Sequence, residues 1–151
     1  MSVRRLLKPN SLLLPSVHVE KQALERAHRD RIVETDGRRV VDSLNLDATM
    51  MKARPREHRW DYLIGTTHPT LVVVGVEIHP ATAGETKVMI AKKEAALHAL
   101  KAHCTAGRSV KRWVWVSSGT TAITKSSREA RQLVANGIRL VGKTLNLAVL
   151  D

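Results

Sequence analysis

Hydrophobic and polar positions alternate along this chain in blocks with two different periods. Apolar residues spaced three or four apart predict helices, and runs of β-branched residues predict strands. The stretch 71–78 is almost entirely apolar, which is typical of a central strand covered on both faces. In chain order, the expected elements are a helix at 16–31, strands at 58–64 and 71–78, a helix at 85–103, a strand at 110–116, a helix at 127–135, and a last strand or hairpin at 138–141 and 145–149. This order predicts an α/β (α+β) domain with a central mixed β-sheet flanked by helices.

The first predicted helix carries an acidic residue on its apolar side. Ser16 follows Pro15 as an N-cap, and Val17 and Leu24 fall on one side of a helix with about 100° per residue. Glu20 falls on that same side, and a carboxylate on a buried face needs an ion pair, a hydrogen bond or a metal. A helix rotated so that Glu20 meets solvent is the alternative.

A turn signal follows this helix. Asp36-Gly37 lies between the apolar pairs Ile32-Val33 and Val40-Val41, which is typical of a hairpin with a two-residue loop. A helix end followed by a turn would give a similar pattern, so both interpretations remain open.

Length and cysteine content restrict the class of protein. The 151 residues predict one domain at 16–151, preceded by an N-terminal arm at 1–15. The single cysteine, Cys104, cannot form an intramolecular disulfide, which excludes a disulfide-rich secreted scaffold and favours a cytoplasmic location. The apolar runs are too short to cross a bilayer, and the leucines that end at Pro15 are too short for a signal sequence. No membrane association is therefore expected.

The chain is basic, and its positive charge is spread along its length. The formal net charge is +11 at pH 7; residues 1–60 carry 13 basic and 8 acidic side chains, and residues 61–151 carry 12 and 6. A distributed excess suggests a folded surface that faces a polyanion, most often nucleic acid. A basic protein without such a partner is the alternative.

Two acidic residues lie in neighbouring predicted strands, where burial is expected. Asp61 lies between Trp60 and Tyr62, and Glu77 lies near the end of the apolar strand. Ionised carboxylates in a central strand destabilise the fold unless a cation compensates them. Two such side chains from adjacent strands can share one divalent ion, and strand alternation places His79 on the same face as Glu77. An ion pair between Glu77 and a helical Lys or Arg is the alternative.

The aromatic residues are expected to anchor these strands. The period of two places Trp113 and Trp115 on one face of their strand, where packing in the core is more common than stacking on bases. The same period predicts that Trp60 and Tyr62 share one face, opposite Asp61.

At these residues the chain resembles the PD-(D/E)XK nuclease superfamily, over roughly residues 16–118. Members of this superfamily join an Asp on one strand to a Glu-x-Lys on the next, within a restriction-endonuclease-like αβββαβ core. Asp61 falls on the Asp and Glu77 on the Glu. Glu20 falls on the acidic residue that many members carry on the first helix.

One residue departs from the superfamily pattern. His79 occupies the position of the lysine. Some members carry the lysine on the following helix, which would make Lys87, Lys92 or Lys93 the candidate here. An altered or inactive site is equally compatible with this departure.

The resemblance implies metal-dependent hydrolysis of a phosphodiester. Asp61, Glu77 and the backbone carbonyl of Ile78 would hold Mg²⁺ or Mn²⁺, which polarises the scissile phosphate and lowers the pKa of bound water. Lys92 or His79 would orient that water or offset developing charge, so the implied catalytic residues are Asp61, Glu77, His79 and Lys92. If His79 instead joins Asp61 and Glu77 as a metal ligand, its imidazole favours Mn²⁺ or another softer ion.

Several polar residues are expected to bind the backbone of the nucleic acid. The loop 117–127 leads from a strand to a helix start, and backbone amides and hydroxyls at a helix N-terminus can bind phosphate. For each residue of this loop, a solvated connection is the alternative. The expected contacts are Ser118, Thr120, Thr121, Lys125 and Arg128 around this loop, together with Lys87 and Lys93 on the preceding helix.

The sequence favours a metal-dependent nuclease that acts on DNA or RNA, and it leaves a homodimer open. One alternative is a non-catalytic nucleic-acid-binding domain with a degenerate nuclease core. Another is a basic protein-interaction domain, such as an immunity or assembly factor, whose surface meets an acidic partner.

Overall fold

The computed structural model describes residues 1–67, 72–119 and 121–150. In chain order their elements, with 3-10 helices written η, are α1 (Val3–Leu6), η1 (Leu14–Ser16), β1 (His18–Val19), α2 (Arg26–Arg29), β2 (Ile32–Val33), β3 (Val40–Asn45), α3 (Leu46–Met50), β4 (Tyr62–Thr66), β5 (Val72–His79), η2 (Ala83–Glu85), α4 (Thr86–Leu100), β6 (Arg112–Ser117), α5 (Arg128–Ala135), β7 (Ile138–Val141), β8 (Leu145–Asn146) and η3 (Leu147–Leu150).

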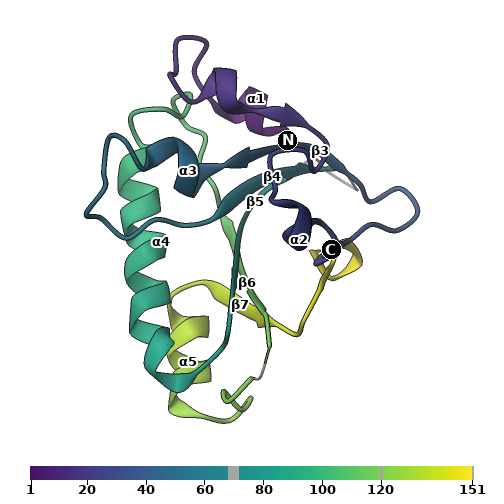
Figure 1. The fold of residues 1–151 in the computed structure, drawn as a ribbon, viewed down its shortest axis with the longest axis vertical. Helices are drawn as coiled ribbons and strands as arrows, with labels where there is room; N and C mark the ends of the chain where they lie inside the picture. The colour runs from purple at the N-terminus through teal and green to yellow at the C-terminus, as the bar shows by residue number, and fades with distance from the viewer. Residues whose placement is uncertain (68–71, 120, 151) are drawn as a thin grey trace.

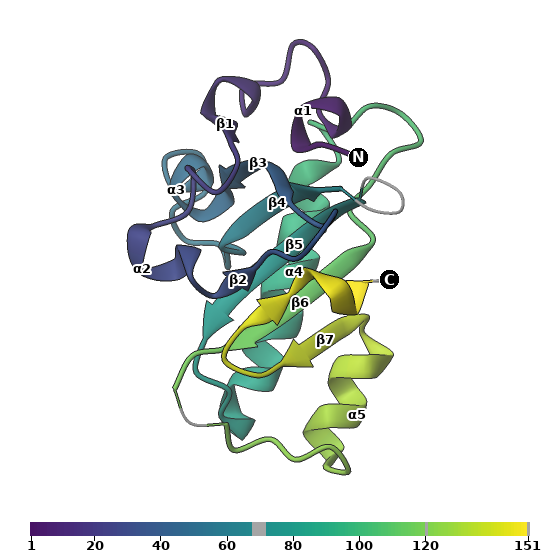
Figure 2. The same cartoon turned by 90° about the vertical axis from the view of Figure 1, so that its right-hand side faces the viewer.

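A six-stranded mixed sheet forms the centre of the fold. Its strand order is β1-β3-β4-β5-β6-β7, and Figure 2 shows these strands side by side, from β3 near the top of the view to β7 below. The first four strands in this order pair antiparallel, whereas β5–β6 and β6–β7 are parallel. A separate parallel pair joins β2 to β8. The predicted α/β fold with a central mixed sheet flanked by helices is confirmed.

Each face of the sheet carries its own layer. Val73 of β5 packs in a cluster with Met89 of α4 and Leu133 of α5, which cover one face (Figure 1). Val74 packs in the opposite cluster with Leu145 of β8, beside α2 and the C-terminal η3. Because β5 is covered on both sides, its almost entirely apolar sequence is explained.

A glycine in β5 allows the sheet to approach a tryptophan closely. A Cβ atom at Gly75 would lie 2.4 Å from Cε3 of Trp113 on the neighbouring strand. Trp113 and Trp115 are both buried on the α4 side of the sheet, as their spacing predicted. Close packing of the ring on β5 therefore depends on a residue without a side chain.

The predicted helix at 16–31 is wrong. His18 and Val19 instead form β1, which pairs with β3, and within 16–31 the α-helical residues are Arg26–Arg29. Val17 packs in the cluster on the α4 face, whereas Leu24 packs in the cluster on the opposite face. Their helical spacing therefore does not reflect one shared face, because the chain crosses from one layer to the other between them.

The prediction that Trp60 and Tyr62 share a face is also wrong. Trp60 packs on the α4 side, edge-on to Trp113 with ring centroids 5.1 Å apart, whereas Tyr62 packs in the opposite cluster. Regular strand structure begins only at Tyr62, so alternation cannot be extended back to Trp60.

The turn at Asp36-Gly37 forms, but it does not join a simple hairpin. Thr35 and Arg38 bridge across it, and Gly37 has a φ of 73°. The strands on its two sides separate at once: β2 pairs with β8, while β3 pairs with β1 and β4. The last strand or hairpin predicted at 138–141 and 145–149 is also wrong, because β7 pairs with β6 whereas β8 pairs with β2.

The first 15 residues pack into the domain. Val3 and Leu6 of α1 are completely buried. The carboxylate of Asp42 on β3 accepts hydrogen bonds from the backbone amides of Val3 (2.8 Å) and Arg4 (3.1 Å). The segment predicted as an arm thus contributes to the core. Among the described residues, none of the helices has the length and apolarity that a bilayer span requires.

Candidate functional site

Two carboxylates from adjacent strands lie together at the end of the β4–β5 pairing where β4 begins. Asp61 directly precedes β4 and, by the register of Tyr62 with Val76, lies opposite Glu77. The amide of Asp61 donates to Oε1 of Glu77 (2.9 Å), and the amide of Ile78 donates to Oδ2 of Asp61 (3.0 Å). Each carboxylate is thus held by the backbone of the other strand. The two predicted acids therefore lie together on the sheet.

A lysine from α4 completes this group. Nζ of Lys92 lies 2.6 Å from Oε2 of Glu77. The Glu77 side chain is fully buried, and that of Lys92 is 19% exposed. Lys92 reaches the sheet because it lies three residues after Met89 and four before Ala96, two buried residues of the same helical stripe.

The other two helical lysines have different surroundings. Lys93 donates to the backbone carbonyl of Asn136 at the end of α5, which ties the two helices together. Lys87 is exposed in the first turn of α4. Of the three lysines, Lys92 is the one whose ammonium contacts an acid of the site.

The buried pair of acids has perturbed protonation. Burial, and then the charge of Asp61, raise the pKa of Glu77 from 4.5 to about 8, although Lys92 opposes this change. Burial also raises the pKa of Asp61, against the Ile78 amide and Lys92, which favour its charged form. Burial and the closeness of the two carboxyl groups therefore disfavour the state in which both are ionised.

The oxygen atoms of this group fit a hard divalent cation. Asp61 accepts from the Ile78 amide through Oδ2, and within residues 1–67, 72–119 and 121–150 its Oδ1 is left for a ligand. The carbonyl of Ile78 points to the same side as its amide, because the N–H and C=O of one strand residue face the same neighbour. Together with Glu77, these groups offer only oxygen ligands, as Mg²⁺ and Mn²⁺ prefer. Mg²⁺ commonly uses only one or two carboxylates and fills the rest of its shell with water.

His79 lies on the predicted face but is directed to another acid. Its Nε2 is 3.4 Å from Oε2 of Glu85, and its backbone carbonyl accepts from the indole of Trp115 (2.9 Å). In the part of the chain that the structure describes, no group of three or more His, Cys, Asp or Glu side chains could hold a metal. His79 is therefore not brought together with Asp61 and Glu77 as a third ligand.

Glu20 does not occupy the face of a helix. It follows β1 in an exposed turn with a φ of 49°, and its amide donates to the carbonyl of Val41. Since β1 lies two strands away from β4 in the sheet, Glu20 is on the side of β3 that faces away from Asp61. The expectation of a helical acid on a buried face is wrong, because the local structure is a strand and a turn.

Two residues that the sequence did not single out lie near Asp61. The amide of Asp47 donates to the Asp61 carbonyl (3.2 Å), and the Asp47 carboxylate pairs with Nε of Arg59 at 2.8 Å. His28 of α2 lies 2.7 Å from the Tyr62 hydroxyl through Nδ1. The charge of Asp47 raises the pKa of Asp61, and that of His28 lowers it. In the sequence, Asp47 follows the capping residue Asn45, a signal for a helix start but not for a site.

The loop after β6 starts beside this group. Ser117 is in register with His79, and the amide of Ser118 donates to the His79 carbonyl (3.2 Å). Lys125 is exposed, as are Thr121 and Arg128, and Ser127 caps α5 by accepting from the amide of Ala130, whereas Thr120 lies outside the described residues. The loop thus leaves the sheet at the same end as Glu77.

Comparisons with protein-family models, with curated proteins and with solved structures found no match for this chain. Its function is therefore inferred from the residues and their geometry.

Proposed function

We propose that this protein is a divalent-metal-dependent nuclease that hydrolyses phosphodiester bonds of DNA or RNA. The observation that carries this proposal is the contact group of Asp61, Glu77 and Lys92, in which a helical lysine lies 2.6 Å from the second acid. The resemblance to the PD-(D/E)XK superfamily requires an Asp, a Glu and a lysine in one place. Lys92 supplies the lysine that position 79 lacks.

The arrangement of elements supports the finer assignment to a restriction-endonuclease-like core. The strands β3, β4 and β5 pair antiparallel in that order, α4 crosses one face, and β6 returns parallel to β5. This order resembles the βββαβ part of the core, with α3 inserted between β3 and β4. The short helix α1 lies further upstream, separated from β3 by β1, α2 and β2.

In the proposed reaction, Asp61, Glu77 and the Ile78 carbonyl would hold Mg²⁺ or Mn²⁺. The ion would supply a Lewis acid for the phosphate and lower the pKa of its bound water. Lys92, whose ammonium contacts Oε2 of Glu77, would orient the attacking water or offset charge on the phosphate. The amides of Asp61 and Ile78 keep both carboxylates in position.

Cleavage assays on labelled single- and double-stranded DNA and RNA test this proposal. We expect cleavage with Mn²⁺ or Mg²⁺, none with EDTA, and a loss of about a hundredfold or more in D61N, E77Q and K92M. K101M, a change at the exposed C-terminal end of the same helix, is the matched control and should remain active. Cleavage that survives D61N and E77Q would refute the proposal, as would an equal loss in K101M.

A specific feature favours one second candidate, a non-catalytic nucleic-acid-binding domain with a degenerate core. Glu77 is fully buried, and its carboxyl group already accepts hydrogen bonds from Lys92 and from the Asp61 amide, so it has polar partners without a metal. This candidate predicts oligonucleotide binding without cleavage and no change in Tm when Mn²⁺ is added. A metal-dependent rise in Tm that disappears in D61N would exclude it.

A further inference from the structure

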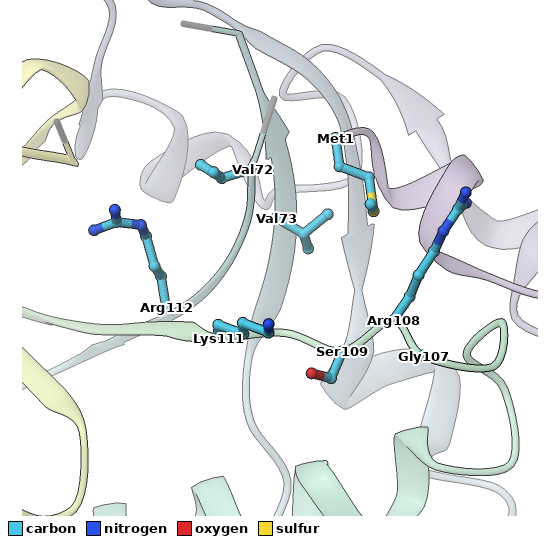
Figure 3. A pocket seen from close by; sticks show the side chains of 8 residues that line it. All are labelled: Met1, Val72, Val73, Gly107, Arg108, Ser109, Lys111 and Arg112. Carbon is cyan, nitrogen blue, oxygen red and sulfur yellow. The ribbon is translucent and has the colours of Figure 1, made fainter. Parts of the chain in front are cut away.

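A basic pocket lies at the opposite end of β5 from Glu77. It has a volume of about 570 Å³ and lies where β5 and β6 begin. Met1 and Val73 line it on the α4 side of the sheet, Val72 lines it on the opposite side, and the segment 107–112 that leads into β6 lies across from them (Figure 3). The pocket is therefore assembled from three separate parts of the chain.

The segment 107–112 brings cationic side chains to this pocket. Arg108, Lys111 and Arg112 all line it, and all are exposed. Across residues 1–67, 72–119 and 121–150, no carboxylate lies within 4.0 Å of their charged atoms; Arg108 instead donates to the backbone carbonyl of Arg5 (2.6 Å). Three positive charges thus line one pocket without an acidic partner among the described residues.

These cations are arranged in a row. In Figure 3, Arg112 and Arg108 extend from opposite ends of the segment, and Lys111 lies between them. A site for one small anion would need its donors to converge on a single point. A row of cations instead fits a chain of phosphates, as in grooves that follow a nucleic-acid backbone.

We propose that this pocket is a phosphate track that binds the backbone of a nucleic-acid strand away from the cleavage site. The track rests on the proposed function for the identity of its polyanion. Arg108, Lys111 and Arg112 bind successive phosphates as the strand passes the end of the sheet, where Met1, Val72 and Val73 lie. The track adds sequence-independent affinity and holds the strand in register with the sheet.

The spacing along β5 relates the track to the site. Val73 lines the pocket and Glu77 lies four residues further along the same strand, about 13 Å at 3.3 Å per residue. With the rise of about 3.4 Å per base pair of a duplex, about four base pairs span this distance.

Metal-free binding measures the track independently of cleavage. The affinity of a fluorescent 20-nucleotide strand, and of the matching duplex, is determined by anisotropy in EDTA at several salt concentrations. The test variant is K111Q/R112Q. The control is R131Q/K143Q, which removes one arginine and one lysine at exposed positions outside the pocket. Equal Tm values for both variants verify that they fold.

For K111Q/R112Q, the loss of two phosphate contacts should reduce the magnitude of the slope of log K against log salt. The expected reduction is about 1.4 for the single strand and about 1.8 for the duplex. If the variant and the wild type bind equally at about 1 M salt, the variant then binds the single strand roughly 25-fold more weakly at about 0.1 M salt. The control pair should retain the wild-type slope. An unchanged slope in K111Q/R112Q, an equal change in the control, or no binding by the wild type would overturn the track.

Two further results separate the possible explanations. Complete competition by millimolar inorganic phosphate would show a small-anion site and overturn the track. If the wild type never cleaves but K111Q/R112Q shows the expected change in binding, the nuclease proposal is refuted and the track is supported. Active cleavage with an unchanged salt slope would leave the nuclease proposal and reject the track.

Discussion

Replacing Glu77 by Gln should change how stability depends on pH. Burial and the neighbouring Asp61 raise the pKa of Glu77 from 4.5 to about 8 in the folded chain. The folded state therefore holds this proton more tightly than the unfolded state does. Stability from the protonated carboxyl is fully present below pH 4.5 and is lost as the pH rises to about 8.

The size of the effect follows from these two pKa values. Each pH unit between 4.5 and about 8 corresponds to about 1.4 kcal/mol, which gives about 5 kcal/mol across the whole interval. Glutamine keeps the shape of the protonated acid, and its one carbonyl oxygen can accept either from Lys92 or from the Asp61 amide. Because glutamine does not titrate, the stability of E77Q relative to the wild type should rise by about 4 kcal/mol between pH 5 and pH 9.

Urea unfolding in EDTA at pH 5, 7 and 9 measures this difference. The buried indoles of Trp60, Trp113 and Trp115 provide the fluorescence signal. E94Q removes an exposed carboxylate from the same helix as Lys92 and is the matched control, which should follow the wild type. If the wild type instead becomes more stable relative to E77Q as the pH rises, Glu77 is a charged partner in a structural ion pair, and the reasoning is wrong.

Three other predictions concern the fold and the site. Asp42→Ala should reduce the free energy of unfolding, measured by urea denaturation, by roughly 2 to 4 kcal/mol, because the two amides at the start of α1 lose their acceptor. Asp42→Asn should reduce it less, and equal reductions would contradict this explanation. Gly75→Ala should cost roughly 1 to 3 kcal/mol, since its Cβ would lie 2.4 Å from a ring atom of Trp113; unchanged stability would show that the ring can move freely. Mn²⁺ should raise Tm more at pH 8 than at pH 6, because the ion must displace the proton of Glu77, and Asp61→Asn should abolish the rise; an equal rise at both pH values would argue against binding at Glu77.

The strands around the site could be predicted from local sequence. The apolar run 71–78 and the position of Asp61 sixteen residues before Glu77 are features of short segments. Strand alternation within this run places Glu77 and His79 on one face without knowledge of the rest of the chain. The register that brings Asp61 opposite Glu77 depends on how β4 pairs with β5, and alternation did not extend to Trp60.

The choice of lysine could be predicted only in part. Lys92 and Lys93 follow Met89 by three and four residues, so both lie near the buried stripe of α4. The rotation of the helix on the sheet directs Lys92 to Glu77 and Lys93 to α5. That rotation depends on how α4 packs against its neighbours, which helical periodicity alone does not specify.

The sequence by itself determined the elements whose periodicity is local, namely the apolar strand and the long helix after it. It also determined the net positive charge. Tertiary structure alone decided that Val17 and Leu24 lie on opposite faces of the sheet, and that Met1 meets the segment 107–112. The physical reason is how far along the sequence each effect acts. Backbone preference and alternation act between near neighbours, whereas the side chains that face one another across a layer depend on the packing of the whole chain.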